Sequence, residues 1–392
     1  MGSLTSPSSS TSPAAENFPR SSPVSVTLTT EITAPRHEIY AIFSYKQHAD
    51  DVNVSCVMGC YDLSQNTWSH ECFVPGIGEN HILKGFAMVS VGTSIYIIGG
   101  SVHKRVKGGE NSTATLIDQS VGVRSLVLRY DVVTKEWFTC APLMTPRYNF
   151  ACSVCDNKIY VAGGQSTLEF AMGVSSAEVY DVLVNEWTQL PCMTTVRYKC
   201  VGVTYQRKFH VIGGFTSSGN NMPFMDRCSA EVYDVEKGKW DHVNGMWQLD
   251  IPPNQIVVID DNLISSGDCL NVWKGQIETY DRNLNLWYPL EGSRKRDLLS
   301  FSCPSFGNGN NGNEGRNIES RERICLTMAP IGTYLYFLAG YRVAGDQSSC
   351  CTMSLVHRFD TSATNNQWET FEPTQIDGER ELCSHCCVVQ LP

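Results

Sequence analysis

The chain has 392 residues, 42% of them hydrophobic, and a formal net charge of -10. No run of about eighteen apolar residues occurs, which predicts a soluble protein without a membrane-spanning helix. The excess of acid argues against nucleic-acid binding, because that function needs basic surface to displace counterions from phosphates. The 17 cysteines are odd in number and follow no secretory leader, so we expect free thiols in the cytosol or nucleus.

Residues 1–36 are dominated by Ser, Thr and Pro. Such a composition buries too little apolar surface to offset the entropy lost on ordering. We therefore expect a disordered tail at residues 1–36, followed by one folded domain at residues 37–392. A plastid transit peptide is the alternative for the tail, although it would carry more basic residues than this stretch does.

The folded part is a series of similar units, of which Arg147 to Trp187 and Arg197 to Trp240 are the clearest pair. In each, an apolar run ends in a glycine doublet, and a Tyr-Asp pair and a tryptophan follow after a loop. Short runs rich in Val, Ile, Tyr and Phe between turn residues predict strands. Six aromatic-Asp pairs occur along the chain, with the aromatic residue at positions 61, 130, 180, 233, 280 and 359. A tryptophan follows seven residues later in the first five and nine residues later in the sixth, which predicts six units.

A period of about fifty residues with these features resembles the kelch repeat. The resemblance implies an all-β fold, a six-bladed kelch-type β-propeller in which each unit forms a four-stranded blade. The first unit has a strand at Glu38 to Phe43 but no innermost strand ahead of it. Because Cys383 to Val389 matches that missing strand, we expect a C-terminal strand to complete blade 1. The chain looks most like kelch-repeat proteins of plants, and we expect no F-box or BTB domain in the tail.

The repeated residues predict structure and not a site. Glycine permits positive φ and close approach of the backbone, aromatic rings fill the space between blades, and the aspartates cap tight turns. Function is expected on the connecting loops, which a rigid scaffold holds in place. Two long ones stand out: Ser101 to Gly122, which contains His103, and the insertion Glu291 to Arg323.

Three arginines share one position in the repeat. Arg147, Arg197 and Arg323 each lie sixteen residues before the first residue of the doublet of their unit, while Lys84 and Arg380 lie within a residue or two of the same place. In propellers that resemble kelch proteins, this position is at the mouth of the central channel. Two interpretations stay open. The cations form a rim that binds anions, since arginine binds carboxylates bidentately, or they pair with acids of their own chain.

The cysteine and histidine pairs do not predict a metal site. Cys152 and Cys155 have the spacing of a zinc or redox motif, but residues three apart on a strand point to opposite faces. The same alternation separates Cys383, His385 and Cys386, whereas zinc needs four converging ligands. We expect no metal and no cofactor.

Two functions of different class follow. The first is a protein-interaction module, an adaptor or scaffold that binds a partner, with an acidic segment at the channel mouth as the expected contact. The alternative is a small-molecule enzyme, a lyase or isomerase of specialised metabolism, with its active site in the same mouth. There the arginines would hold the substrate and His103 could move protons. A deep cavity with a titratable group of perturbed pKa would favour the enzyme.

Overall fold

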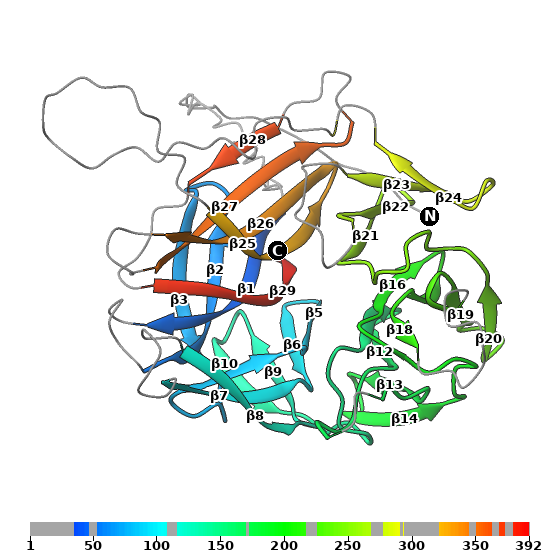
Figure 1. Cartoon of the computed structure of the whole chain (residues 1–392), viewed down its shortest axis with the longest axis horizontal. Helices are drawn as coiled ribbons and strands as arrows, with labels where there is room; N and C mark the ends of the chain where they lie inside the picture. Colours follow the sequence, from blue (N-terminus) through cyan, green and yellow to red (C-terminus); the bar gives the residue numbers. More distant parts are fainter. Residues whose placement is uncertain are drawn as a thin grey trace, which may run out of the picture. The chain divides into compact units, whose positions relative to one another are not determined.

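The computed structural model describes residues 35–46, 53–107, 116–169, 172–216, 226–267, 277–290, 293, 321–344, 350–362, 368–372 and 379–391. Strands dominate this part of the chain, and they form six four-stranded sheets and two smaller sheets. Each four-stranded sheet is one blade, so the predicted all-β fold of six blades is confirmed (Figure 1). The predicted disordered tail lies outside the described residues, except that strand β1 begins at Arg36.

All six blades have the same antiparallel order, from an innermost to an outermost strand. In that order blade 1 is β29 (Glu379–Leu391), β1 (Arg36–Lys46), β2 (Ser55–Asp62) and β3 (Thr67–Phe73), and blade 2 is β5 (Ala87–Val91), β6 (Ser94–Ile98), β9 (Val127–Asp131) and β10 (Glu136–Thr139). Blade 3 is β11 (Ala151–Cys155), β12 (Lys158–Ala162), β13 (Ala177–Asp181) and β14 (Glu186–Leu190), and blade 4 is β16 (Val201–Tyr205), β17 (Lys208–Ile212), β19 (Ala230–Asp234) and β20 (Lys239–Val243). Blade 5 is β21 (Ile256–Ile259), β22 (Asn262–Ser265), β23 (Glu278–Asp281) and β24 (Leu286–Pro289), and blade 6 is β25 (Arg321–Ile331), β26 (Tyr334–Ala344), β27 (Cys350–Asp360) and β28 (Trp368–Phe371).

The C-terminal strand completes blade 1, as the sequence predicts. β29 pairs antiparallel with β1 from Arg36 opposite Leu391 to Lys46 opposite Glu379, and Figure 1 shows the red strand beside the blue one. The innermost strands contact one another in the cycle β29, β5, β11, β16, β21, β25 and back to β29. The two ends of the described domain are therefore joined by an antiparallel ladder, which one irregularity between Ala41 and Phe43 interrupts, and the ring of blades is closed.

The two smaller sheets lie outside the blades. β4 (His81–Lys84), β7 (Ser101–Lys107) and β8 (Leu116–Val123) form a three-stranded sheet, and β15 (Arg197–Tyr198) pairs with β18 (Phe215–Thr216). The expectation of a loop at Ser101 to Gly122 was wrong in this respect, because most of that stretch forms strands β7 and β8. We call β4, β7 and β8 the accessory sheet.

The repeated residues have the structural roles that their chemistry predicts. In blade 3, Tyr180 lies opposite Trp187 with ring centroids 5.1 Å apart, and its hydroxyl donates to Asn185 at 2.7 Å. Asp131 of blade 2 caps its turn by accepting the backbone N–H groups of Val133 and Thr134 at 3.0 and 3.1 Å. These contacts lie within each blade, which is why they recur at fixed spacing.

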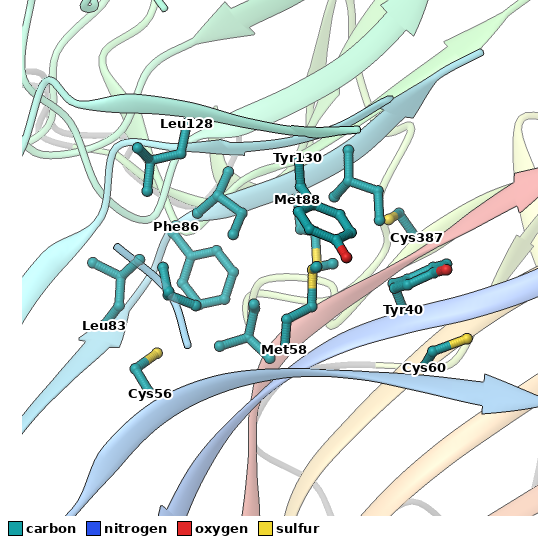
Figure 2. Close-up of a cluster of buried hydrophobic side chains, with 14 of the residues drawn as sticks. Tyr40, Cys56, Met58, Cys60, Leu83, Phe86, Met88, Leu128, Tyr130 and Cys387 are labelled. Carbon is teal, nitrogen blue, oxygen red and sulfur yellow. The ribbon is translucent and has the colours of Figure 1, made fainter. Parts of the chain in front are cut away.

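The hydrophobic core is divided among the spaces between blades. Six clusters of buried side chains occur in the described residues, and each draws its members mainly from two neighbouring blades. Figure 2 shows the cluster between blades 1 and 2, where Tyr40 and Met58 face Met88 and Tyr130. A blade that buries large apolar side chains on both faces depends on both neighbours, so the closed ring is the stable unit.

Candidate functional site

Arg147 is buried in the connection that leads into blade 3. Its side chain has 0% exposure. One terminal nitrogen donates to the carbonyl oxygens of Gly163 and Ser176 at 2.8 and 3.0 Å, and the other donates to the carboxylate of Glu178. Burial lowers the pKa of the Arg147 guanidinium, and the charge of Glu178 partly offsets that effect. The group is a buried ion pair with its hydrogen bonds directed into its own blade.

Arg197 repeats this arrangement in blade 4. Its side chain also has 0% exposure, and it donates to the carbonyl oxygens of Gly213 and Ser229 at 3.0 and 3.2 Å. Its Nε lies 3.5 Å from the carboxylate of Glu231. Glu231 in turn accepts the backbone N–H of Thr194 at 2.7 Å, just as Glu178 accepts that of Met144 in blade 3.

Each of these arginines also joins its blade to the preceding one. The backbone N–H of Gly100, in the doublet of blade 2, donates to the carbonyl of Arg147 at 2.9 Å, and that of Gly164 donates to the carbonyl of Arg197 at 2.8 Å. The first glycine of the doublet is needed for this approach: a Cβ at Gly99 would lie 2.5 Å from the Arg147 oxygen. The backbone of the arginine thus binds one doublet and its side chain binds the next.

The rim hypothesis therefore does not fit Arg147 and Arg197. A guanidinium with no exposed surface and an internal acid cannot contact a partner or a substrate in this conformation. The alternative drawn from the sequence, pairing with neighbouring acids, describes both residues. For Arg323 the structure places the backbone in β25, opposite Tyr341, while its side chain lies outside the described part.

Blade 2 has leucines where blades 3 and 4 have the ion pair. Leu83 lies sixteen residues before Gly99, as Arg147 does before Gly163, and Leu128 takes the place of Glu178. Both leucines are buried in the cluster of Figure 2, with Phe86 drawn between them. The same two positions are thus occupied by apolar side chains in blade 2 and by an ion pair in blades 3 and 4.

A channel of about 620 Å³ passes between the six innermost strands. Its polar lining side chains largely bind neighbouring blades. Ser90 donates to the Val388 carbonyl at 2.6 Å, and the hydroxyls of Ser153 and Thr204 are 2.9 Å apart. His385 also lines the channel. Burial lowers the pKa of its imidazole below the usual 6.5, which favours the neutral form at pH 7.

Burial disfavours the reactive thiolate form of the cysteines along the channel. Burial raises the pKa of Cys200 to about 11 and that of Cys386 to about 12, and it raises the pKa of Cys152 as well. A thiol that remains protonated at neutral pH is a poor nucleophile and a poor metal ligand. In the described part of the chain no group of three or more His, Cys, Asp or Glu side chains is placed to hold a metal ion.

Among the described residues that line the channel, one exposed cation lies at its mouth between blades 3 and 4. Lys199 lines the channel entrance, and its ammonium lies 6.0 Å from the ring centroid of Phe215. The centroid of the Tyr198 ring lies 5.5 Å from that of Phe215. Tyr148 is a neighbour of Tyr198: burial raises the pKa of Tyr148, and the nearby Tyr198 raises it further. We call Tyr148, Tyr198, Lys199 and Phe215 the mouth surface. No described acidic side chain pairs with Lys199.

Lys84 and His103 come together on the accessory sheet. Lys84 donates to Asp118 at 2.8 Å, and both ring nitrogens of His103 contact serine hydroxyls, Ser101 at 2.9 Å and Ser120 at 3.2 Å. Burial, with the charge of Lys84, lowers the pKa of His103. The imidazole is thus neutral, and both of its nitrogens are occupied within its own sheet.

Sequence reasoning missed the acids of this sheet. Asp118 also accepts from Arg105 at 2.8 Å, and Arg105 reaches Glu381 of β29 at 3.3 Å. Arg380 precedes Glu381 in β29, so its side chain points to the opposite face of the sheet. Its guanidinium carbon lies 6.0 Å from the ring centroids of Phe43 and Tyr45. Lys84 and Arg380 are therefore held by different neighbours.

Comparison with known proteins agrees with this architecture. A family model described as the Kelch motif matches residues 146–194, which span blade 3. The F-box/kelch-repeat protein At1g16250 of Arabidopsis thaliana is 28% identical over 233 residues, 58% of this chain and 56% of that protein. The F-box/kelch-repeat protein At3g27150 of Arabidopsis thaliana is 31% identical over 168 residues, 41% and 38% of the two chains, and Beta-scruin of Limulus polyphemus is 26% identical over 225 residues, 54% and 24%.

The chain spans about half the length, or less, of these relatives. Among the described residues no helix is long and apolar enough to cross a membrane. The glycine doublets, the Tyr-Asp and Trp pairs, the six closed blades and the matched motif all lead to one assignment. The chain folds as a six-bladed β-propeller, contains a kelch motif and is similar to the kelch-repeat proteins of plants.

Proposed function

We propose that this chain is a protein-interaction module and that it binds an acidic segment of a partner protein at the mouth surface. One observation carries the proposal. Lys199 is an exposed cation at the mouth of the channel, it has no described acidic partner, and aromatic rings lie beside it. An otherwise acidic protein with a lysine at this place that has no described acidic partner presents a local site for carboxylates.

The scaffold holds this surface in a fixed shape. Lys199 has a φ of 52°, a conformation that is uncommon for residues other than glycine and persists where the surroundings determine it. Its backbone N–H donates to the carbonyl of Asn149 at 2.7 Å, which joins blade 4 to blade 3. Two residues earlier, the buried guanidinium of Arg197 fixes the start of the same turn. A preorganised surface binds with little loss of conformational entropy.

The aromatic rings complement the charge. Tyrosine and phenylalanine at a mouth supply rigid contact area, and tyrosine adds a hydrogen-bonding group. Arg227 lies 5.7 Å from the Phe215 ring, but Asp250 pairs with it at 3.2 Å, so its charge is already satisfied. The segment that fits is therefore short, carries an Asp or Glu for Lys199, and places an apolar or planar group against Tyr198 and Phe215.

The test uses a phage-displayed library of random peptides, selected on the immobilised full chain. We expect the selected peptides to be enriched in Asp and Glu and to bind Lys199→Glu at least about tenfold more weakly than wild type. Lys239→Glu is the matched control, because it makes the same charge change on the outermost strand of blade 4. Peptides without acidic enrichment, or equal loss of binding in both variants, would contradict the proposal.

The enzyme alternative keeps one specific observation in its favour. A channel of about 620 Å³ has the size of a small-molecule site, and His385 lies in it as a neutral imidazole. The substrate would not be held by Arg147 and Arg197, as the sequence suggested, because both side chains are buried. No aspartate or glutamate occurs among the described lining residues, so His385 would act without a carboxylate partner. A metabolite that native mass spectrometry finds on wild type, and not on a Thr204→Trp variant with a filled channel, would favour this function.

A further inference from the structure

The accessory sheet ends in an open edge. β8 pairs with β7 on one side, and no described strand pairs with its other side. Natural proteins protect such edges with lysine, proline or very short strands. β8 instead spans eight residues with Asp118 as its one charged side chain, and Asp118 is neutralised by Arg105 and Lys84. Ile117 and Val121 are 50% and 59% exposed on this strand.

The hydrogen bonds already made show which backbone groups are free. The N–H of Arg105 donates to the carbonyl of Asn80 on the β4 side, so the backbone of Arg105 points away from β8. In an antiparallel ladder the N–H and C=O of one residue point to the same side, and alternate residues point to opposite sides. Asp118 lies opposite Arg105 and Ser120 lies opposite His103. The backbone groups of Asp118 and Ser120 therefore point outward from the edge.

We propose that β8 binds the β8 of a second copy of this chain, antiparallel, about a two-fold axis at Gln119. In this register Asp118 of each copy faces Ser120 of the other, so the residues with outward backbone groups form the two hydrogen-bonded pairs. Ile117 of each copy faces Val121 of the other, and Gln119 faces itself. The two accessory sheets join into one sheet across the axis.

The sequence of the edge is self-complementary, and this favours a second copy over an unrelated strand. Apolar side chains oppose apolar ones, the hydroxyl of Ser120 opposes the carboxylate of Asp118, and no like charges meet directly. Contacts of this type on both subunits are isologous, so the assembly closes as a dimer and does not grow into a fibre. The strand is short and the surface it buries is small, so we expect a reversible dimer with a dissociation constant of about 10 µM.

The experiment is sedimentation equilibrium of the purified full chain from about 1 to about 200 µM. Ser120→Pro removes an outward N–H and leaves the β7–β8 ladder intact, since proline is tolerated where the N–H faces solvent. Ser120→Ala is its matched control, because it loses the hydroxyl but keeps the N–H. We expect Ser120→Pro to raise the dissociation constant at least about tenfold relative to Ser120→Ala.

A charge exchange tests the register itself. The variant with Ile117→Lys and Val121→Lys and the variant with Ile117→Glu and Val121→Glu should each be monomeric, because like charges would face each other across the axis. Mixed in equal amounts, they should form a dimer of one copy of each. A wild type that stays monomeric throughout the range, a dimer equally stable in Ser120→Pro, or a mixture that does not associate would each overturn the proposal.

Discussion

The buried pair of Arg147 and Glu178 allows a direct test of its structural role. Arg147→Leu removes the cation and leaves the Glu178 carboxylate buried, together with two carbonyl oxygens that lose a donor. Breaking a buried ion pair in this way costs about 3–5 kcal/mol of the free energy of unfolding. That is a large part of the total for a protein whose stability is of the order of 5–15 kcal/mol.

The double variant Arg147→Leu/Glu178→Leu should recover a substantial part of this loss. Leu83 and Leu128 occupy the same two positions in blade 2 and are 3% and 5% exposed there. We expect the double variant to be about 2 kcal/mol more stable than Arg147→Leu, although the N–H groups of Met144 and Thr145 lose their acceptor. Replacing a buried pair by apolar residues is often less costly than breaking it.

Urea denaturation, followed by tryptophan fluorescence, measures both changes. The control is Lys158→Met, which breaks an ion pair of the same blade with Asp181 at 2.8 Å, where the lysine side chain is 46% exposed. An exposed pair of this kind contributes no more than about 1 kcal/mol. Two results would contradict a stabilising role of the buried arginine. One is that Arg147→Leu lowers the free energy of unfolding by no more than Lys158→Met does. The other is that the double variant loses as much as Arg147→Leu and Glu178→Leu lose together.

Three further predictions concern single positions. Gly202→Ala should destabilise the protein by about 2 kcal/mol or more, because a Cβ there would lie 2.4 Å from the Cys152 nitrogen. Gly122→Ala is the control, since a Cβ at Gly122 meets nothing within 4 Å. Thermal unfolding of the two variants measures the difference. Burial alone would raise the pKa of Asp118, but its hydrogen bonds with Arg105 and Lys84 hold that pKa at about 2, below the usual 3.8. Asp118 therefore stabilises the fold above about pH 4, and its contribution decreases as the pH falls toward 2. Asp118→Asn should therefore lose about 1 kcal/mol at pH 7 and only a small part of that at pH 2, where about half of the wild-type Asp118 carboxylates are protonated. Equal losses at both values would refute this. Iodoacetamide should label the exposed Cys192 of the native protein and leave Cys200 unlabelled until denaturant is added, as peptide mass spectrometry would show.

The sequence predicts the blades because their repeated residues contact one another inside a blade. The spacing of Tyr180 and Trp187 is set by a two-strand turn, so it recurs in every blade that has that turn. The closing strand was predictable for the same reason, since Cys383 to Val389 repeats the innermost-strand pattern. Long connections carry no such constraint. Strands β7 and β8 escaped prediction because β7 pairs with β4 and β8 pairs with β7, and neither pairs with a blade.

The direction of the arginine side chains was not predictable from their position alone. A count of sixteen residues before the doublet places Arg147 near the channel mouth but does not say whether the guanidinium faces solvent or the blade. A partial signal did exist. Blades 3 and 4 have both the arginine and a glutamate two residues before the tyrosine, Glu178 and Glu231, whereas blade 2 has a leucine at both places. The two positions do not change together in every unit, because blade 5 has Glu278 with Ile251 and blade 6 has Arg323 with His357.

The closed ring is the claim on which the channel, the mouth surface and the accessory sheet all depend. It is tested most directly by a cross-link between His37→Cys in β1 and Gln390→Cys in β29, which lie opposite each other in the ladder. Opposed positions of an antiparallel pair are close enough for a disulfide. The same chain with His37→Cys and Lys239→Cys, in blade 4, is the control.

After mild oxidation of dilute protein, peptide mass spectrometry should find residues 37 and 390 joined within one chain, and residues 37 and 239 separate. Because the cross-link would close a loop of nearly the whole domain, it should also raise the melting temperature of the oxidised form over that of the reduced form. Absence of the 37–390 link, or equal linking of 37 to 239, would contradict the closure of blade 1 by the C-terminal strand.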